Sequence, residues 1–250
     1  MHEFQLYRSP DHACAYLTGK TAQTLVVDPL APMDQVIYSA LVDQGYRRSG
    51  SMVYRPECNS CRRCIPVRIP VALFQPRRIH RRILKKWRDT QVTIGRPRYD
   101  KEHFRLFSHY LETRHAEGDM VGMNPGQYMD FLRCSWGESW FVEFRRAEML
   151  SMVAVVDPLT QGLSSVYTYF DPRESAASPG AYAILWQILE TRRLGLKWLY
   201  LGFLVPGSKK MDYKRNYRPL QAFDYASNTW YWHDDAWLSA QSPVPITDNL

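Results

Sequence analysis

The sequence predicts an α/β (α+β) protein in which mixed β-sheets are flanked by helices. Apolar residues recur at helical spacing in residues 33–44, 101–115 and 181–189, and the pattern changes to that of strands from residue 139. The composition is ordinary for a globular protein, with 45% hydrophobic and 14% aromatic residues. A chain of 250 residues can bury a large core, as one domain or as two.

The N-terminal part is expected to be rich in turns as far as residue 34, because proline and glycine interrupt it repeatedly. Within it, residues 25–27 are expected to form a short buried strand. Residues 33–44 have the spacing of one helix face, and Gly45 ends that helix. Residues 52–54 and 65–69 are expected to be extended, so the segment between them is a loop that joins two strands.

Three helices are expected in the middle of the chain. Pro76 opens a strongly basic helix over residues 77–88, because proline is tolerated at a helix start. Residues 101–115 have an apolar face and predict an amphipathic helix, and residues 128–134 predict a shorter one.

The C-terminal half has the pattern of a mixed sheet with one long helix. Residues 139–145 and 150–156 predict a hairpin, residues 163–170 a third strand, and residues 197–203 a fourth. Between the last two, Ser178 is a candidate N-cap, Pro179 the first helical residue and Gly195 the helix end. This order of elements is that of an N-acetyltransferase-like (GNAT-like) core. The tail after Pro243 is expected to be frayed.

The charge of the chain indicates a polyanionic partner. The net charge is +7 and the pI about 9.2. Seven of the twelve residues 77–88 are basic, and they are candidates to bind the phosphates of a nucleic acid, the alternative being a solvated helix face. These candidates are Arg77, Arg78, Arg81, Arg82, Lys85, Lys86 and Arg88. No apolar run is long enough to span a membrane and no signal peptide is evident, so we expect a cytoplasmic protein without membrane contact.

Four of the five cysteines are candidate metal ligands. Cys58, Cys61 and Cys64 have C-x-x-C-x-x-C spacing, and Cys14 precedes them. Four thiolates suffice for zinc or an iron–sulfur centre, whereas the alternative is a set of reduced cysteines that pack a loop. Cys134 lies in a mostly apolar run and is expected to be a small core residue.

Several separate motifs stand in the order found in one protein family. They are Cys14-Ala15-Tyr16-Leu17, Gly45-Tyr46-Arg47-Arg48-Ser49-Gly50, Tyr54-Arg55-Pro56, Cys61-x-x-Cys64-Ile65-Pro66-Val67-Arg68-Ile69, Val166-Tyr167-Thr168-Tyr169-Phe170-Asp171-Pro172, Tyr182-Ala183-Ile184-Leu185-Trp186-Gln187 and Lys210-Met211-Asp212-Tyr213-Lys214. From about residue 10 to 235 the chain resembles the bacterial aspartate/glutamate leucyltransferases, relatives of the eukaryotic arginyl-tRNA–protein transferases. The resemblance implies a duplicated GNAT-like fold, with domains at residues 1–95 and 96–250.

The same resemblance implies an activity and its partners. Leucine would pass from leucyl-tRNA to the α-amine of proteins that begin with Asp or Glu, which marks them for the N-end rule pathway. No cofactor is required for this transfer. Arginyl-transferases carry a second early cysteine that can join an iron–sulfur site, but Leu17 stands at that position here. An iron–sulfur centre or zinc is therefore not carried over directly.

The implied chemistry selects candidate site residues. An aminoacyl ester is already activated, so the protein must position an amine and stabilise an oxyanion. Candidate catalytic residues are Tyr167, Tyr169, Asp212 and Tyr213. An acidic acceptor side chain calls for cations. The candidates for substrate binding are Arg47, Arg48, Arg55, Arg68, Lys209, Lys210, Lys214 and Arg218. Core packing of the tyrosines and a solvated loop for the lysines are the alternatives.

Three other functions compete with leucyl transfer. Arginyl transfer would use the same fold and acceptors. Acetyl transfer from acyl-CoA is disfavoured because residues 175–180 lack the Arg/Gln-x-x-Gly-x-Gly/Ala turn that holds pyrophosphate. A cysteine-knuckle RNA-binding module would explain the charge and thiols but not the GNAT-like half. The sequence does not predict an oligomeric state.

Overall fold

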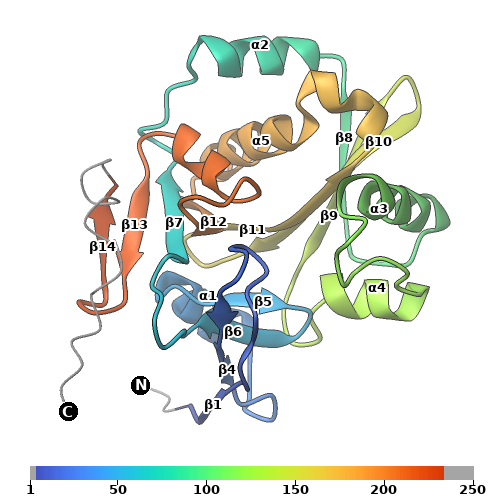
Figure 1. Cartoon of the computed structure of the whole chain (residues 1–250). Coiled ribbons are helices and arrows are strands. Elements are labelled where there is room, and N and C mark those ends of the chain that lie inside the picture. The colour runs from blue at the N-terminus through green and yellow to red at the C-terminus, as the bar shows by residue number, and fades with distance from the viewer. Residues whose placement is uncertain (1–3, 234–250) are drawn as a thin grey trace, which may run out of the picture.

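The computed structural model describes residues 4–233, and the predicted frayed tail lies outside them (Figure 1). An eight-stranded sheet has the order β14-β13-β7-β12-β11-β10-β9-β8, a four-stranded sheet the order β1-β4-β6-β5, and β2 pairs with β3. The strands are β1 (Leu6–Arg8), β2 (His12–Ala13), β3 (Thr21–Ala22), β4 (Thr24–Val27), β5 (Arg47–Ser49), β6 (Met52–Pro56), β7 (Ile65–Pro70), β8 (Gln91–Gly95), β9 (Trp140–Arg146), β10 (Met149–Pro158), β11 (Gly162–Phe170), β12 (Trp198–Leu204), β13 (Gln221–Asp224) and β14 (Thr229–Trp232).

Helices cover both faces of the large sheet. They are α1 (Gln35–Asp43), α2 (Arg78–Lys86), α3 (Lys101–Arg114), α4 (Pro125–Leu132), α5 (Pro179–Arg193) and the short 3₁₀ helices η1 (Pro172–Ala177) and η2 (Asp212–Asn216). One core cluster joins α5 and α2 to the sheet, and a second joins α3 and α4 to its other face. A third unites α1 and the small sheet with Tyr200 of β12. Figure 1 shows α2 lying over α5, on the side of the sheet away from α1.

The prediction of mixed sheets flanked by helices is confirmed. Local details differ: only Val27 of the strand predicted to be buried at residues 25–27 is buried, and β5, β8, β13 and β14 were not predicted. α4 begins at Pro125, earlier than predicted, because Asn124 and Gln127 form a capping box there. Ser178 lies before α5, but its backbone is left-handed and its side chain makes no capping hydrogen bond.

β11 and β12 are parallel neighbours over a short stretch only. Their register runs from Gly162–Trp198 to Ser164–Tyr200. Beyond it β11 follows β10 as far as Phe170, whereas β12 follows β7. The register of β12 with β7 shifts at the same level, between Tyr200 and Gly202. The carboxyl ends of two parallel strands therefore diverge, and the main-chain groups that face the divergence need other partners.

Both halves of the chain contribute to the large sheet. β7 precedes residue 96 and lies between β12 and β13, while β8 forms the edge beside β9. The division at residue 95 thus stays a prediction. Within residues 4–233, none of the helices combines the length and apolarity needed to cross a bilayer.

Candidate active site

Arg47 lies at the divergence of β11 and β12. Its Nη2 donates to the carbonyl oxygens of Ser165 at 2.9 Å and Val166 at 3.2 Å, just past the last paired residue of β11. Its Nη1 is buried and has no hydrogen-bond partner among residues 4–233. The guanidinium comes this close to β12 because residue 202 is a glycine: a Cβ there would collide with Nη1. Arg47 therefore presents one unused donor beside the diverging strands.

Lys214 is a second basic residue at the same place, on the β12 side. It lies in η2 and is buried. Its Nζ donates to the carbonyl oxygen of Phe203 at 2.5 Å. Burial, and then the charge of Arg47, lower the pKa of Lys214 well below that of a free lysine, while Cys64 acts in the opposite direction. The divergence thus has two basic groups, of which one is pushed toward its neutral form.

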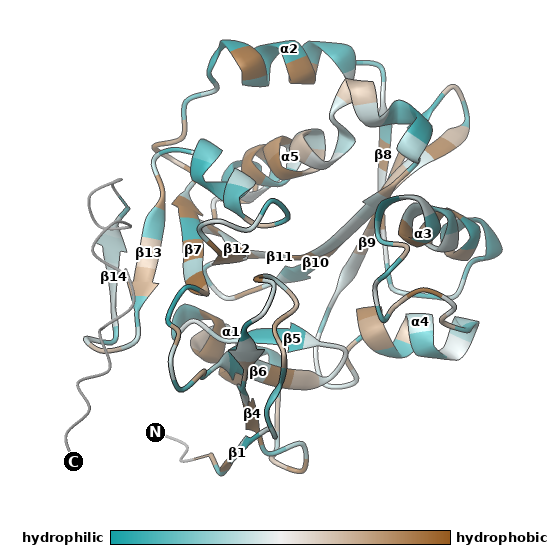
Figure 2. Ribbon diagram, in the orientation of Figure 1, coloured by the Kyte–Doolittle hydropathy of each residue, from teal (hydrophilic) through white to brown (hydrophobic). Residues whose placement is uncertain are grey.

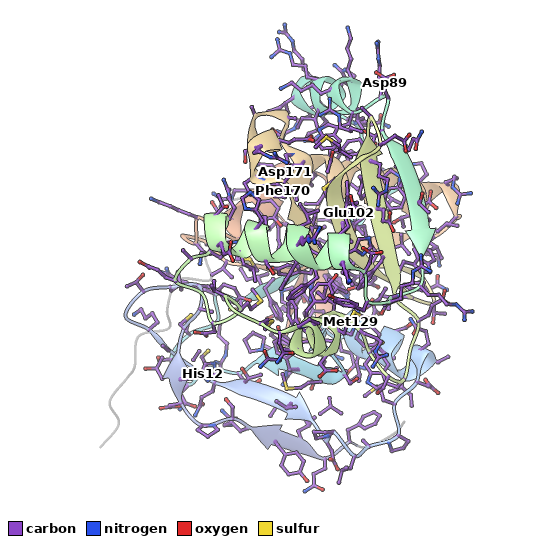
Figure 3. All side chains as sticks on the ribbon, turned by 90° about the vertical axis from the view of Figure 1, so that its right-hand side faces the viewer. His12, Asp89, Glu102, Met129, Phe170 and Asp171 are labelled. Atoms are coloured by element: carbon purple, nitrogen blue, oxygen red, sulfur yellow. The ribbon has the colours of Figure 1, made fainter. Side chains whose placement is uncertain are left out.

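Tyr110 of α3 lies near both Tyr213 and Tyr167. Tyr213 is 44% exposed, yet surrounding protein desolvates its hydroxyl, and with Tyr110 this raises the pKa to about 12. Burial and Tyr110 also raise the pKa of Tyr167. Both hydroxyls therefore stay protonated near neutral pH and can donate hydrogen bonds. The side chain of Tyr110 packs edge-on against Phe170, which Figure 3 shows beside α3.

Tyr169 lies in the core, close to Tyr167. The two rings are 6.5 Å apart, as alternate residues of one strand face allow. The Tyr169 side chain has no exposed surface, and its hydroxyl is 2.7 Å from that of Tyr128. Its hydrogen-bonding capacity is used inside the protein, so we do not include it in the site proposed below.

Arg48 belongs to a buried ion pair. Its guanidinium binds both carboxylate oxygens of Asp157 at 2.6 Å, and Ser139 and the carbonyl oxygen of Gly50 accept further hydrogen bonds. The side chains of Arg48 and Asp157 are fully buried. The sequence placed Arg48 among the substrate-binding candidates, but the structure gives it a role in packing.

Arg68 and Arg55 are held by aromatic rings and carboxylates. Arg68 lies between the rings of Trp198 and Trp230, at 3.8 Å and 4.1 Å, and pairs with Asp43 at 2.5 Å. Arg55 lies 4.7 Å from the Tyr225 ring centre and forms a 3.1 Å ion pair with Glu57. These partners bind the two cations within the protein.

The remaining charged candidates lie in η2 and in the segments on either side of it. Lys209, Lys210 and Arg218 are exposed, and the charge of Lys210 contributes, after burial, to a lowered pKa of His115. Asp212 is partly exposed and lies 3.5 Å from Arg215. Of the predicted residues, the structure brings together Arg47, Tyr167, Tyr213 and Lys214, with Asp212 in the same short helix as the last two.

The four candidate metal ligands gather on one side of this site. After burial, Cys58, Cys14 and Cys61 raise the pKa of Cys64 to about 12. Within residues 4–233, however, no group of three or more His, Cys, Asp or Glu residues is placed to hold a metal ion. The placement of the thiols therefore does not fit zinc or an iron–sulfur cluster, and we derive no chemistry from either.

The basic helix α2 packs its apolar side inward. His80, Ile83 and Trp87 are buried, whereas the seven predicted basic residues are exposed. Figure 2 shows hydrophobic and hydrophilic bands along α2, and Figure 3 shows side chains projecting from it away from the sheet. All seven therefore lie at the surface, where polyanion contacts are feasible.

Sequence reasoning missed Tyr110 and Gly202. Tyr110 lies in a predicted amphipathic helix and is not distinguished there from a core aromatic residue. Gly202 did carry a signal, because glycine inside a strand often marks a bulge or the close approach of another group.

The protein is thus an α/β protein in which a guanidinium, a buried lysine and two protonated tyrosines gather where two parallel strands diverge, a set of hydrogen-bond donors suited to an anionic ligand. The sequence models of arginine-tRNA-protein transferase match at residues 12–82 (N terminus) and 102–224 (C terminus). The chain belongs to this family.

Among its relatives are proteins named aspartate/glutamate leucyltransferase. That of Pseudomonas putida (strain W619) is 46% identical over 217 residues, which are 87% of this chain and 92% of that protein. That of Pseudomonas savastanoi pv. phaseolicola is 47% identical over the same shares. The crystal structure of FemX resembles this fold only distantly, with 10% identity, a TM-score of 0.43, and coverage of 83% of this chain and 81% of that one.

Proposed function

We propose that this protein is an aminoacyltransferase that moves leucine from leucyl-tRNA to the α-amino group of proteins beginning with Asp or Glu. The observation that carries the proposal is the 46–47% identity, over 87% of the chain, to proteins named for that activity. The chemistry at the divergence of β11 and β12 supports it. The products would be marked in the cytoplasm for N-end rule degradation.

The tyrosines suit the acyl-transfer step. Attack of the amine on the leucyl ester places negative charge on the carbonyl oxygen, and fixed neutral donors stabilise that charge. Tyr213, exposed and protonated, is our candidate donor, with Tyr167 beside it. The ester itself supplies the leaving group, the terminal ribose of the tRNA.

Arg47 is our candidate for recognition of the acidic first residue. Its Nη1 is buried without a partner, which is costly unless a ligand uses the donor. A carboxylate of Asp or Glu would form a charge-assisted hydrogen bond there. Lys214, beside it, adds a basic group whose pKa burial lowers.

Asp212 is our candidate partner for the α-ammonium group of the acceptor. Its carboxylate lies in η2, next to Tyr213. The amine must lose a proton before it attacks, and its pKa near 7.7–8.0 makes that loss easy near neutral pH. A water molecule or the ribose hydroxyl of the tRNA can take the proton.

Arginyl transfer is the second candidate, because the matching family models carry that description. A transfer assay decides between them. Purified protein is mixed with labelled leucyl-tRNA or arginyl-tRNA and with peptides that differ only in their first residue, Asp, Glu or Lys. We expect leucine on the Asp and Glu peptides alone. Arginine on those peptides would favour the second candidate, and no modification of any peptide would contradict both.

A further inference from the structure

The seven basic residues of and around α2 fall into two groups. Three of them bind main-chain carbonyl oxygens of the protein: Arg77 that of Asn216 at 2.6 Å, Arg81 that of Pro76 at 2.6 Å, and Lys86 that of Ala176 at 3.0 Å. Arg88 pairs with Asp89 just beyond the helix, at 3.1 Å. These cations fasten the helix or are neutralised.

The other three basic residues carry unpaired charge. Arg78, Arg82 and Lys85 are exposed, and no hydrogen bond or ion pair holds their side chains within residues 4–233. Their spacing of four and three residues places them on one face of the helix. At 1.5 Å per residue the row is about 10 Å long, which is about three times the rise per nucleotide of about 3.4 Å in one strand of B-form DNA. We call this row the phosphate ladder.

The two ends of the ladder lie near different parts of the molecule. At the N-terminal end, Arg77 binds Asn216 of η2, and His80 stacks on Tyr217 with ring centres 5.5 Å apart. At the C-terminal end, Lys86 and Trp87 bind the carbonyl oxygens of Ala176 and Ala177 in η1. Arg78 is therefore the rung nearest Tyr213 and Lys214, and Lys85 the rung farthest from them.

We propose that the ladder binds successive phosphates of one strand of the tRNA acceptor arm, with the aminoacylated 3′ end at Arg78 and the duplex toward Lys85. This inference rests on the proposed function, since it takes the ester to react near Tyr213. The three cations then determine both the affinity for the tRNA and the direction in which its strand lies along the helix. Each contributes a salt-dependent contact that carries no sequence information.

Two leucyl donors of different length test the polarity. One is the leucyl ester of the trinucleotide CCA, and the other a short acceptor-stem duplex with the same leucyl-CCA end. Arg78→Gln, Arg82→Gln and Lys85→Gln each remove one charge, and glutamine retains good helix propensity. Lys197→Gln is the matched control, because Lys197 is exposed just before β12, at the end of that strand away from the divergence.

We expect Arg78→Gln to lower kcat/KM about fivefold with both donors, and Lys85→Gln to do so with the duplex donor only. The affinity for the duplex without a leucyl group is measured by fluorescence anisotropy at several salt concentrations. The slope of log affinity against log salt concentration should fall in magnitude by about one for each cation of the ladder that is removed. The opposite pattern between the two ends would overturn the polarity, and three variants that behave like Lys197→Gln would overturn the ladder. Rung-dependent binding without any leucyl transfer by the wild type would instead contradict the proposed function.

Discussion

Nη2 of Arg47 lies 2.9 Å from the carbonyl oxygen of Ser165, at the point where β11 leaves β12. On the other strand, Lys214 donates to the carbonyl oxygen of Phe203. Main-chain groups of two strands that no longer pair with each other are thus bound by two basic side chains, and Arg47 keeps positive charge at the divergence. The same contacts stabilise the fold and prepare the place where we expect an acidic acceptor.

Gly202→Ala should reduce both stability and activity. Gly202 has φ +73, so alanine adds left-handed strain of about 1–2 kcal/mol, and its Cβ would also meet the guanidinium of Arg47. We expect a larger loss in the free energy of unfolding than strain alone gives, and a lower kcat/KM for Asp-initiated peptides. Urea unfolding and the transfer assay measure the two effects.

Gly195→Ala is the matched control for that variant. Gly195 has φ +70, but a Cβ added there would have no neighbour within 4 Å among residues 4–233, so this position carries the strain without the collision. Equal losses of stability in the two variants, with activity intact in both, would show that the approach of Arg47 to residue 202 has no consequence.

Arg48→Met should destabilise the protein strongly without any direct effect on substrate recognition. Removal of one partner of a buried ion pair leaves Asp157 as an uncompensated charge, which costs about 3–5 kcal/mol. The double variant Arg48→Met with Asp157→Leu removes both charges, and we expect it to recover part of that loss. Urea unfolding of the two variants checks this, and a double variant less stable than the single one would contradict it.

Lys214→Met should change how stability depends on pH. The pKa of Lys214 in the folded chain lies well below the value of about 10.4 in the unfolded chain, so between these values the unfolded chain binds the additional proton. The contribution of Lys214 to stability therefore rises with pH. As the pH rises from the folded pKa of Lys214 toward its unfolded value, wild type should gain on the variant by up to about 1.4 kcal/mol per pH unit.

Urea unfolding at constant ionic strength measures this difference. Comparison with the variant cancels the opposite effect of groups whose pKa is raised on folding, such as the Cys64 thiol. A difference between the two proteins that stays constant over this range would mean that Lys214 remains charged in the fold.

Arg47 and Arg48 show which features of the candidate site could be predicted from the sequence alone and which could not. Both arginines were candidates for substrate binding, and neighbouring residues of a strand point to opposite faces. Which face meets an acidic partner depends on Asp157, 109 residues away, and local patterns do not report such a distance. The two arginines could be predicted as candidates, but it could not be predicted that Arg48 is fully paired within the protein whereas Arg47 keeps an unpaired donor.

In the fold, too, elements that depend on local sequence could be predicted, whereas the order of strands, which depends on residues distant in the chain, could not. The helix before β12 and the strands β9 to β11 follow from periodicity and turn residues, so the sequence predicted them. The position of β7 between β12 and β13 could not be predicted, because its partners lie more than a hundred residues later in the chain. The divergence of β11 from β12, on which the site depends, likewise arises from pairing with other strands.

Cys64 should react slowly with alkylating agents despite its partial exposure. Burial and three neighbouring cysteines raise its pKa to about 12, so the thiolate fraction near pH 8 is reduced at least about a hundredfold relative to a free cysteine. Brief treatment of native protein with iodoacetamide, followed by peptide mass spectrometry, measures its modification. The same cysteine in urea-unfolded protein is the control, and equal rates in the two states would contradict the raised pKa.

Tyr213→Phe should lower kcat and leave stability nearly unchanged, whereas Tyr169→Phe should lower stability and leave kcat nearly unchanged. Tyr213 is 44% exposed beside Lys214, and loss of its hydroxyl removes our candidate oxyanion donor, so kcat should fall about 10²-fold with little change in stability. The Tyr169 hydroxyl is hydrogen-bonded to that of Tyr128 in the core, and its loss should cost about 1 kcal/mol of stability with kcat retained. Single-turnover transfer of leucine to an Asp-initiated peptide and urea unfolding separate the two outcomes. A catalytic defect confined to Tyr169→Phe would move the reaction from the η2 side of the divergence to the face of the sheet under α3 and α4.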